Sequence, residues 1–202
     1  ELLCAVVGNH GQSFQVAQEI IALLSDLLEE PLEVARVTHY DEPFSYDEIC
    51  INSAIRYQLE YDIYRRTQSK DKLGGDTSSV FDIHEGLTAI MLSDGMGSSK
   101  RAQQESSRLI GLMKECLSHQ MKPETAMHTL HYTLSLRDEK DMYATLDFAL
   151  VDLQLGQFWC WKSGGMTTYV LRGPEVFTLE SKSAPIGSMT SLEIETDSLE
   201  LV

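Results

Sequence analysis

Asp76, Asp94 and Gly95 are the residues of this sequence best suited to carry out chemistry. Two neighbouring carboxylates repel each other and resist ionising together unless a divalent cation compensates their charge. Ligands that offer only oxygen favour Mg²⁺ or Mn²⁺ over zinc. Gly95 directly follows Asp94 and permits a tight turn that would add its own carbonyl oxygen to the same ion. The three residues predict a metal centre, provided that the fold brings them together.

A predicted hairpin would bring the two carboxylates together. The stretches VFDI at 80–83 and LTAIML at 87–92 have the composition of strands, and HEG at 84–86 has that of the turn between them. Asp76 enters the first strand and Asp94 leaves the second, so both would lie at the same end of the sheet. The residues alone leave an alternative open, because Asp-Gly is a common turn dipeptide and Asp before a helix is commonly its cap.

The residues after this turn suggest phosphate chemistry. Gly97 would let the chain reverse into a helix capped by Ser98 or Ser99. The weakly positive N-terminus of that helix suits an anion, and a metal ion beside an anion site is typical of phosphate-processing sites. Lys100 and Arg101 in the first helical turn are candidate contacts to a substrate phosphate, with a solvated pair as the alternative.

Two helices are expected after this loop, each with one apolar face. The first face comprises Ala102, Ser106, Leu109, Ile110, Met113, Cys116 and Leu117, and the second comprises Met127, Leu130 and Leu134. His128 and His131 lack a partner acid at ligand spacing and are expected on the helix surface. These faces are ordinary for helices that pack on a sheet.

Strand patterns fill most of the remaining chain. Residues 57–63 alternate between apolar and polar, which predicts a half-buried strand. Five further stretches of this kind follow Asp138, joined by short turns. Asp147 in one of them is interpreted as an outward or hydrogen-bonded sheet residue, with a third metal ligand as the alternative. Strands, two helices and then strands again favour an α+β domain with layered antiparallel sheets.

The first part of the chain has a pattern of its own. It reads as a strand at 2–7, a helix from Ser13 and an extended stretch at 32–38. The polar, acidic residues 39–48 are predicted to be a linker or an exposed loop. We expect an N-terminal region at 1–52 and the main domain at 53–202.

Composition excludes several classes of protein. The formal charge of -15, from 31 acidic and 16 basic residues, argues against binding nucleic acid or anionic lipid and favours metal ions or basic partners. The four cysteines form no C-x-x-C pair, so neither a zinc ribbon nor a disulfide framework is expected, and a reducing cytoplasm fits. No calcium-binding loop of the D-x-D-x-D-G type occurs. No apolar run approaches the roughly 20 residues that span a bilayer, so we expect a soluble fragment whose membrane segment, if any, lies outside it.

The run GGDTSSVFDIHEGLTAIMLSDGMGSSKRAQQES resembles the phosphatase domain of the stage II sporulation protein E family, a branch of the phosphatase 2C-like, PPM-type protein serine/threonine phosphatases. MYATLDFALVDL, KSGGMTTYVLRGPEVFTLES and SAPIGSM follow in the order of that family, and FQVAQEIIALLSDLLEEPLEV resembles the helical region before its phosphatase domain. The resemblance implies a sandwich of two antiparallel sheets flanked by helices, C-terminally truncated here.

The resemblance also implies roles for the three site residues. It implies two Mn²⁺ or Mg²⁺ ions and direct hydrolysis of a phosphoester without a phosphoenzyme. By position, Asp94 matches the bridging Asp, Gly95 the carbonyl ligand and Asp76 the Asp on the second metal. The family completes its site with a second Asp-Gly and a further Asp, whereas this chain ends at Val202 before either. We therefore expect about half of the metal site here, with one ion or none in this chain, and an exposed sheet edge.

The activity implied is that of a metal-dependent protein serine phosphatase of sporulation. Its implied substrate is a phosphoserine on an anti-sigma factor antagonist, so that dephosphorylation activates a sporulation sigma factor. The resemblance further implies a homodimer, formed with the help of residues 14–28, and a parent protein in the membrane of the sporulation septum with this chain on the cytoplasmic face. The alternative is a non-catalytic regulatory or scaffold fragment that keeps the fold and binds partners without hydrolysis.

Overall fold

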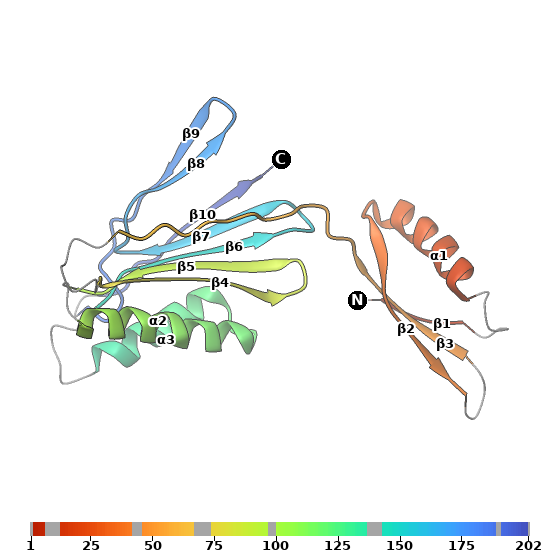
Figure 1. Cartoon of the computed structure of the whole chain (residues 1–202), viewed down its shortest axis with the longest axis horizontal. Helices are drawn as coiled ribbons and strands as arrows, with labels where there is room; N and C mark the ends of the chain where they lie inside the picture. Colours follow the sequence, from red (N-terminus) through yellow and green to blue (C-terminus); the bar gives the residue numbers. More distant parts are fainter. Residues whose placement is uncertain are drawn as a thin grey trace. The chain divides into compact units, whose positions relative to one another are not determined.

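The computed structural model describes residues 2–6, 13–41, 46–66, 74–96, 100–136, 143–188 and 191–201. The chain folds as two compact units, Glu1–Arg56 and Tyr57–Val202 (Figure 1). Each unit has its own sheet and its own hydrophobic core.

The first unit is a three-stranded antiparallel sheet with one helix. Its elements are β1 (Leu2–Val6), α1 (Ser13–Leu28), β2 (Leu32–Tyr40) and β3 (Tyr46–Ser53), with β3 between β1 and β2. Ala17 of α1 packs on Ile49 and Ile51 of the central strand, and all three are almost fully buried. Leu23 and Leu27 of the same helix are 71% and 76% exposed.

The prediction of a linker or exposed loop at 39–48 is wrong for the described part of that stretch. Residues 39–40 end β2 and residues 46–48 begin β3, while 42–45 lie outside the described residues. The polar side chains pair across the two strands. The rings of Tyr40 and Tyr46 stack with centroids 4.9 Å apart, and His39 contacts Asp47 through Nδ1 at 2.5 Å and Asp41 through Nε2 at 2.9 Å. Such cross-strand pairs stabilise a hairpin without an apolar pattern.

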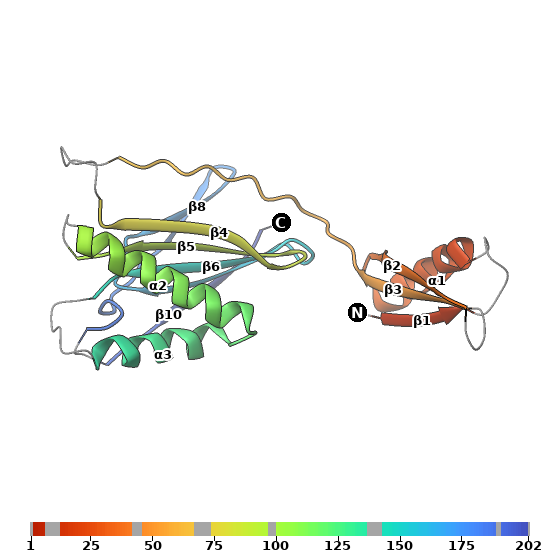
Figure 2. The same cartoon turned by 60° about the horizontal axis from the view of Figure 1, so that its bottom comes forward.

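The second unit is built on a five-stranded antiparallel sheet in the order β10-β7-β6-β5-β4. The elements follow along the chain as β4 (Asp76–His84), β5 (Leu87–Asp94), α2 (Lys100–Ser118), α3 (Pro123–Ser135), β6 (Leu146–Asp152), β7 (Gln157–Ser163), β8 (Thr168–Arg172), β9 (Glu175–Leu179) and β10 (Glu195–Glu200). Strands β8 and β9 form a separate two-stranded sheet. Helices α2 and α3 lie together on one face of the five-stranded sheet (Figure 2).

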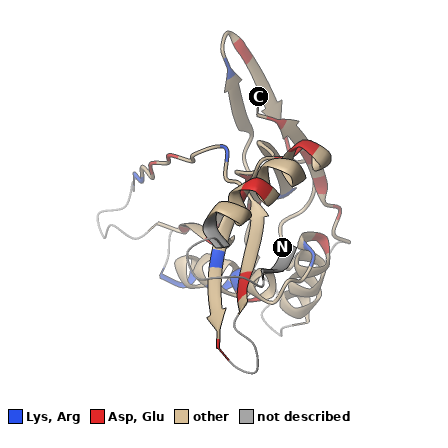
Figure 3. Cartoon of the chain, turned by 90° about the vertical axis from the view of Figure 1, so that its right-hand side faces the viewer, with Lys and Arg blue, Asp and Glu red and all other residues tan. Residues whose placement is uncertain are grey.

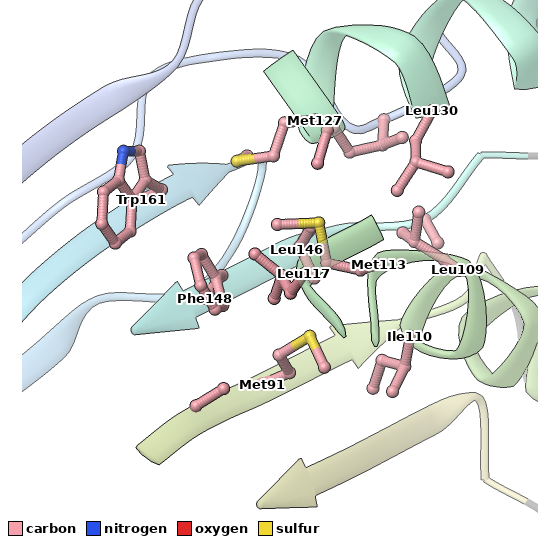
Figure 4. Close-up of a cluster of buried hydrophobic side chains, with 14 of the residues drawn as sticks. Met91, Leu109, Ile110, Met113, Leu117, Met127, Leu130, Leu146, Phe148 and Trp161 are labelled. Carbon is pink, nitrogen blue, oxygen red and sulfur yellow. The ribbon is translucent and has the colours of Figure 1, made fainter. Parts of the chain in front are cut away.

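The core of this unit lies between the two helices and the sheet. The buried side chains come from alternate positions of the strands and from the predicted stripes of the helices (Figure 4). They include Met91, Leu109, Met113, Leu117, Met127, Leu130, Leu146, Phe148 and Trp161. Phe148 stacks on Trp161 with ring centroids 5.1 Å apart, and the Trp161 indole nitrogen donates to Glu124 Oε1 of α3 at 2.6 Å. The helices are thereby fixed on the sheet by packing and by a directional bond.

His131 is not on the helix surface, so that prediction is wrong. Its side chain is only 3% exposed, whereas His128 is exposed as expected. His131 lies one helical turn after Met127 and beside Leu130, so it belongs to the stripe that α3 turns toward the core. Counting only the apolar residues at helical spacing does not identify a buried polar residue such as His131.

The prediction of a strand at 57–63 is also wrong. Residues 54–66 run extended, but no described strand pairs with them. The segment is tied near its ends, where Tyr57 N donates to Leu153 O at 3.0 Å and Arg65 Nη2 donates to Gly74 O at 2.9 Å. Tyr61 and Ile63 line a groove against β4 and β5, but so does Asp62 between them, so the alternation does not separate a buried face from an exposed one here.

Candidate metal centre

Asp76 and Asp94 lie directly opposite each other at the end of the β4–β5 hairpin. The hairpin turns at Glu85-Gly86, as the sequence predicted, and Gly86 has φ +83°, which glycine adopts without strain. This turn sets the register that pairs the two carboxylates. The structure therefore brings the two residues together, while their role as metal ligands stays a prediction.

The electrostatics of the pair would favour a divalent cation. The pKa of Asp94 is raised to about 6, mainly by burial and in addition by a hydrogen bond with Asp76 and by the negative charge of Asp76. A carboxyl group of this kind holds a proton that a divalent cation would replace, because the cation neutralises both charges together. Metal binding at the pair is thus expected to compete with protons below about pH 6.

Gly95 is held so that its carbonyl oxygen remains available. Its N–H donates to Gly75 O at 3.2 Å, and it forms an isolated β-bridge with Ala144. Within the described ranges, no backbone N–H donates to the Gly95 carbonyl. A Cβ added at Gly95 would lie 2.0 Å from the Ala102 carbonyl oxygen of α2, so only glycine fits between the turn and the helix.

Thr145 forms two hydrogen bonds with the backbone of Asp94, a contact that the sequence did not predict. Asp94 N donates to Thr145 Oγ1 at 2.9 Å, and Thr145 N donates to Asp94 O at 2.9 Å. Groups that hold the backbone of a candidate ligand determine where its side chain can point. No spacing in the sequence signals this contact, because Thr145 lies directly before β6, 51 residues further along the chain than Asp94.

Ser106 anchors the other carboxylate strand to α2. Its hydroxyl is fully buried and donates to Gly75 O at 2.6 Å, immediately before Asp76. The same hydroxyl lies 2.7 Å from Thr77 Oγ1 at the start of β4. Both carboxylates therefore emerge from backbone that other elements hold in place.

The predicted phosphate contacts Lys100 and Arg101 are exposed in the first turn of α2. Neither forms a salt bridge with Asp76 or Asp94 in the part of the chain that the structure describes. The predicted turn and cap residues 97–99 lie outside the described residues. In the view of Figure 3, Lys and Arg positions are scattered over several of the coloured elements.

A groove of about 320 Å³ adjoins Asp76. Residues 61–66 form one wall, and β4 and β5 form the other. Arg65 and Arg66 line the same groove as Asp76, and Arg65 Nη2 donates to Gly74 O, two residues before that carboxylate. Neither arginine was identified from the sequence as a candidate phosphate contact.

Asp147 is engaged with a buried lysine. Lys162 Nζ lies 2.6 Å from Asp147 Oδ1 and 2.8 Å from Thr168 Oγ1, and the lysine side chain is only 2% exposed. Burial raises the pKa of Asp147, and the hydrogen bond and charge of Lys162 lower it in part. A Cβ on Gly165 would lie 2.0 Å from Asp147 Oδ1. This geometry matches the hydrogen-bonded sheet residue that the sequence suggested.

The two-metal site that the resemblance implies needs more donors than Asp76, Asp94 and Gly95. Among the described residues, no group of three or more His, Cys, Asp or Glu side chains is placed to hold a metal ion. Two carboxylates and one carbonyl fit a hard cation such as Mg²⁺ or Mn²⁺, with water completing its coordination. The residues present thus fit the group that the resemblance implies, but only in part.

Substituting Gly95 by Ala should destabilise the second unit by about 3 kcal/mol, the upper end of overpacking costs, because the new methyl group meets backbone that cannot rotate away. The matched control is Gly111→Ala, also in this unit, where an added Cβ meets nothing within 4 Å. That control should stabilise the protein by about 1 kcal/mol through helix propensity. Urea unfolding of both variants measures the difference, and equal stabilities would refute the close approach at Gly95.

The fold and the paired carboxylates define this chain as a phosphatase 2C-like protein. The solved PP2C phosphatase domain of SpoIIE from Bacillus subtilis, with a fragment of its regulatory domain, has a TM-score of 0.76 and 26% identity, over 99% of this chain and 57% of that chain. RsbX in complex with magnesium has a TM-score of 0.54 at 14% identity, over 83% of this chain and 73% of that chain, and shows the fold alone.

The family model of stage II sporulation protein E matches residues 84–202, more than half of the chain, and the chain belongs to that family. It is 29% identical to stage II sporulation protein E of Bacillus subtilis (strain 168), over 96% of this chain and 23% of the relative. It is 27% identical to the protein of Priestia megaterium, over 88% of this chain and 31% of the relative. The chain thus spans between a quarter and a third of these relatives. No helix in its described ranges is long and apolar enough to cross a membrane.

Proposed function

We propose that this chain carries part of the catalytic domain of a metal-dependent protein serine phosphatase of sporulation. The observation that carries the proposal is the direct pairing of Asp76 with Asp94 in a hairpin whose next residue is Gly95, to whose carbonyl no backbone N–H of the described residues donates. Membership of the stage II sporulation protein E family supports the same activity. A purely structural turn would not need two carboxylates face to face at a cost in repulsion.

Asp76, Asp94 and the Gly95 carbonyl would hold Mn²⁺ or Mg²⁺, and further ligands would be needed for two ions. When bound, such ions supply an activated water and neutralise charge that develops on the phosphate oxygens. The chain's own residues then have defined tasks. Thr145 holds the Asp94 backbone and Ser106 holds the strand that begins at Asp76, so the carboxylates need little rearrangement to accept a cation.

The proposed substrate is a phosphoserine on an anti-sigma factor antagonist, so that its hydrolysis activates a sporulation sigma factor. The groove beside Asp76 supports a polypeptide substrate, since it is long enough to be lined by residues from three segments. Arg65 and Arg66 on its wall would attract the phosphate, and guanidinium groups match phosphate oxygens in charge and geometry. Lys100 and Arg101 are further candidates for the same anion.

The experiment that tests the proposal is phosphate release from a phosphoserine peptide by the full-length protein that contains this chain. We expect release that requires Mn²⁺ or Mg²⁺ and stops when EDTA removes the ion. Undiminished release after removal of the ion, shown by metal analysis of the treated protein, would contradict the proposal.

A further inference from the structure

A turn formed by Pro185, Ile186, Gly187 and Ser188 lies against α3. Ser188 N donates to Pro185 O at 3.2 Å, and Gly187 at the third position has φ +85°. A positive φ at that position is the mark of a type II turn, in which the N–H of the third residue takes no part in the turn's own hydrogen bond. The Gly187 N–H therefore needs an acceptor from another element.

His131 of α3 supplies that acceptor. Gly187 N donates to His131 Nδ1 at 3.3 Å, and the His131 side chain is 3% exposed. Nδ1 can accept only when it carries no proton, so the contact also fixes which ring nitrogen is unprotonated. This nearly buried histidine therefore accepts a hydrogen bond from a backbone amide of another segment.

The other end of the same peptide unit holds Ala144. The Ile186 carbonyl, which shares a peptide plane with the Gly187 N–H, accepts from Ala144 N at 3.2 Å. Ile186 N donates back to Ala144 O at 2.9 Å. If this peptide rotated about its long axis, both its N–H and its carbonyl would lose their partners. The bond to His131 therefore opposes loss of the pairing at Ala144.

Ala144 is the direct neighbour of the candidate metal loop. It bridges Ile186 on one side and Gly95 on the other, and Tyr143 O accepts from Met96 N at 3.4 Å. The side chains of Ala144 and Ile186 are both buried in the main core. A short ladder thus runs from α3 through the turn and Ala144 to Gly95.

We propose that His131 is a positioning residue for the metal centre, because it fixes the peptide that aligns Ala144 beside the Gly95 carbonyl. This inference rests on the proposed function, since it assigns His131 to the same site. It names a residue of α3 and a hydrogen-bonded path to the site, neither of which the sequence identified. His131 does not touch the carboxylates in this account; it acts only through the ladder.

The test compares His131→Leu, which removes the acceptor and keeps the bulk, with His131→Asn, whose amide oxygen can replace Nδ1. His128→Leu is the matched control, because His128 is exposed on the same helix. Two quantities are measured on this chain: hydrogen exchange of the Gly187 and Ala144 amides without metal, and the dissociation constant for Mn²⁺.

We expect His131→Leu to speed exchange at both amides by about tenfold, which corresponds to about 1.4 kcal/mol and is within the range for loss of one hydrogen bond. Mn²⁺ affinity should fall by about tenfold, as is typical when a group behind a metal ligand is removed. His131→Asn should return both quantities to within about threefold of the unmodified chain, and His128→Leu should leave them unchanged.

Unchanged exchange and unchanged Mn²⁺ affinity in His131→Leu would overturn the inference. Equal losses in the Leu and Asn variants would overturn it as well, because they would indicate that the imidazole packs and does not accept. If the full-length protein that contains this chain bound no Mn²⁺, the proposed function would fail, whereas the metal-free exchange at Ala144 would still decide whether His131 holds the ladder.

Discussion

Asp94→Asn should abolish metal-dependent hydrolysis of a phosphoserine peptide by the full-length protein, lowering kcat/KM by at least about 10³-fold. The amide keeps the shape of the side chain but loses the negative charge that faces Asp76 across the hairpin. Without that charge the cation is held more weakly and the phosphate loses its neutralising partner. The measurement is initial phosphate release with and without Mn²⁺.

The control for this variant is Asp82→Asn, on β4 near the turn at the opposite end of the β4–β5 hairpin. Asp82 accepts from Thr88 Oγ1 at 2.7 Å, and an amide oxygen can still accept that bond, so activity should be retained. Equal activity in Asp94→Asn and in the unmodified protein would rule out the metal-centre account. No hydrolysis by the unmodified protein under any metal would favour the alternative, a scaffold that keeps the fold and binds partners.

Lys162→Met should be the most destabilising substitution outside the metal centre, costing about 3 kcal/mol of unfolding free energy. It leaves Asp147 in a largely enclosed position without its cationic partner, and it removes the bond to Thr168 as well. Urea unfolding measures the loss. The double variant Lys162→Met/Asp147→Leu should recover most of it, because an apolar pair can replace a buried ion pair at little cost.

The cost of Lys162→Met should depend on pH. Burial already raises the pKa of Asp147, and removing Lys162 raises it further because the lysine lowers it. An acid with a raised pKa in the folded state loses stability as the pH rises through that pKa. The deficit should therefore be larger at about pH 8 than at about pH 5, where Asp147 can take up a proton. A deficit independent of pH would show that packing and not charge decides the effect.

Local patterns were sufficient to predict the hairpin and the helices. The apolar stretches VFDI and LTAIML, with a glycine turn between them, predict a hairpin, and its register places Asp76 opposite Asp94. The apolar stripes of α2 and α3 follow from helical spacing in the same way. In both cases the information lies within a few neighbouring residues.

Contacts between distant segments could not be read in this way. Thr145 reaches Asp94 and His131 reaches Gly187 only after the sheet has assembled, and no spacing in the sequence records either contact. The prediction of a strand at 57–63 failed for a different reason. Apolar and polar residues do alternate there, but Tyr61 lines a groove and no described strand pairs with the segment. A period of two therefore did not imply a hydrogen-bonded ladder.

The polar stretch at 39–48 shows a third limit. Its strands are held by the stacked Tyr40 and Tyr46 and by His39 between two carboxylates, and cross-strand pairs of this kind leave no apolar signature. The acids nearby raise the pKa of His39 through hydrogen bonds, first from Asp47 and then from Asp41. Composition alone had identified these residues as a loop.

The most direct test of the metal centre is the titration of Asp94, followed by carboxyl NMR with and without saturating Mg²⁺. Without metal we expect Asp94 to titrate near its raised pKa of about 6. Because the folded state then holds a proton that the unfolded chain has released, the metal-free protein should lose stability as the pH rises from about 4 through 6. Mg²⁺ should lower the pKa below 3.8, the ordinary value for Asp, and restore stability above pH 6. An Asp94 titration that Mg²⁺ leaves unchanged would contradict the assignment of Asp76 and Asp94 as ligands of one cation.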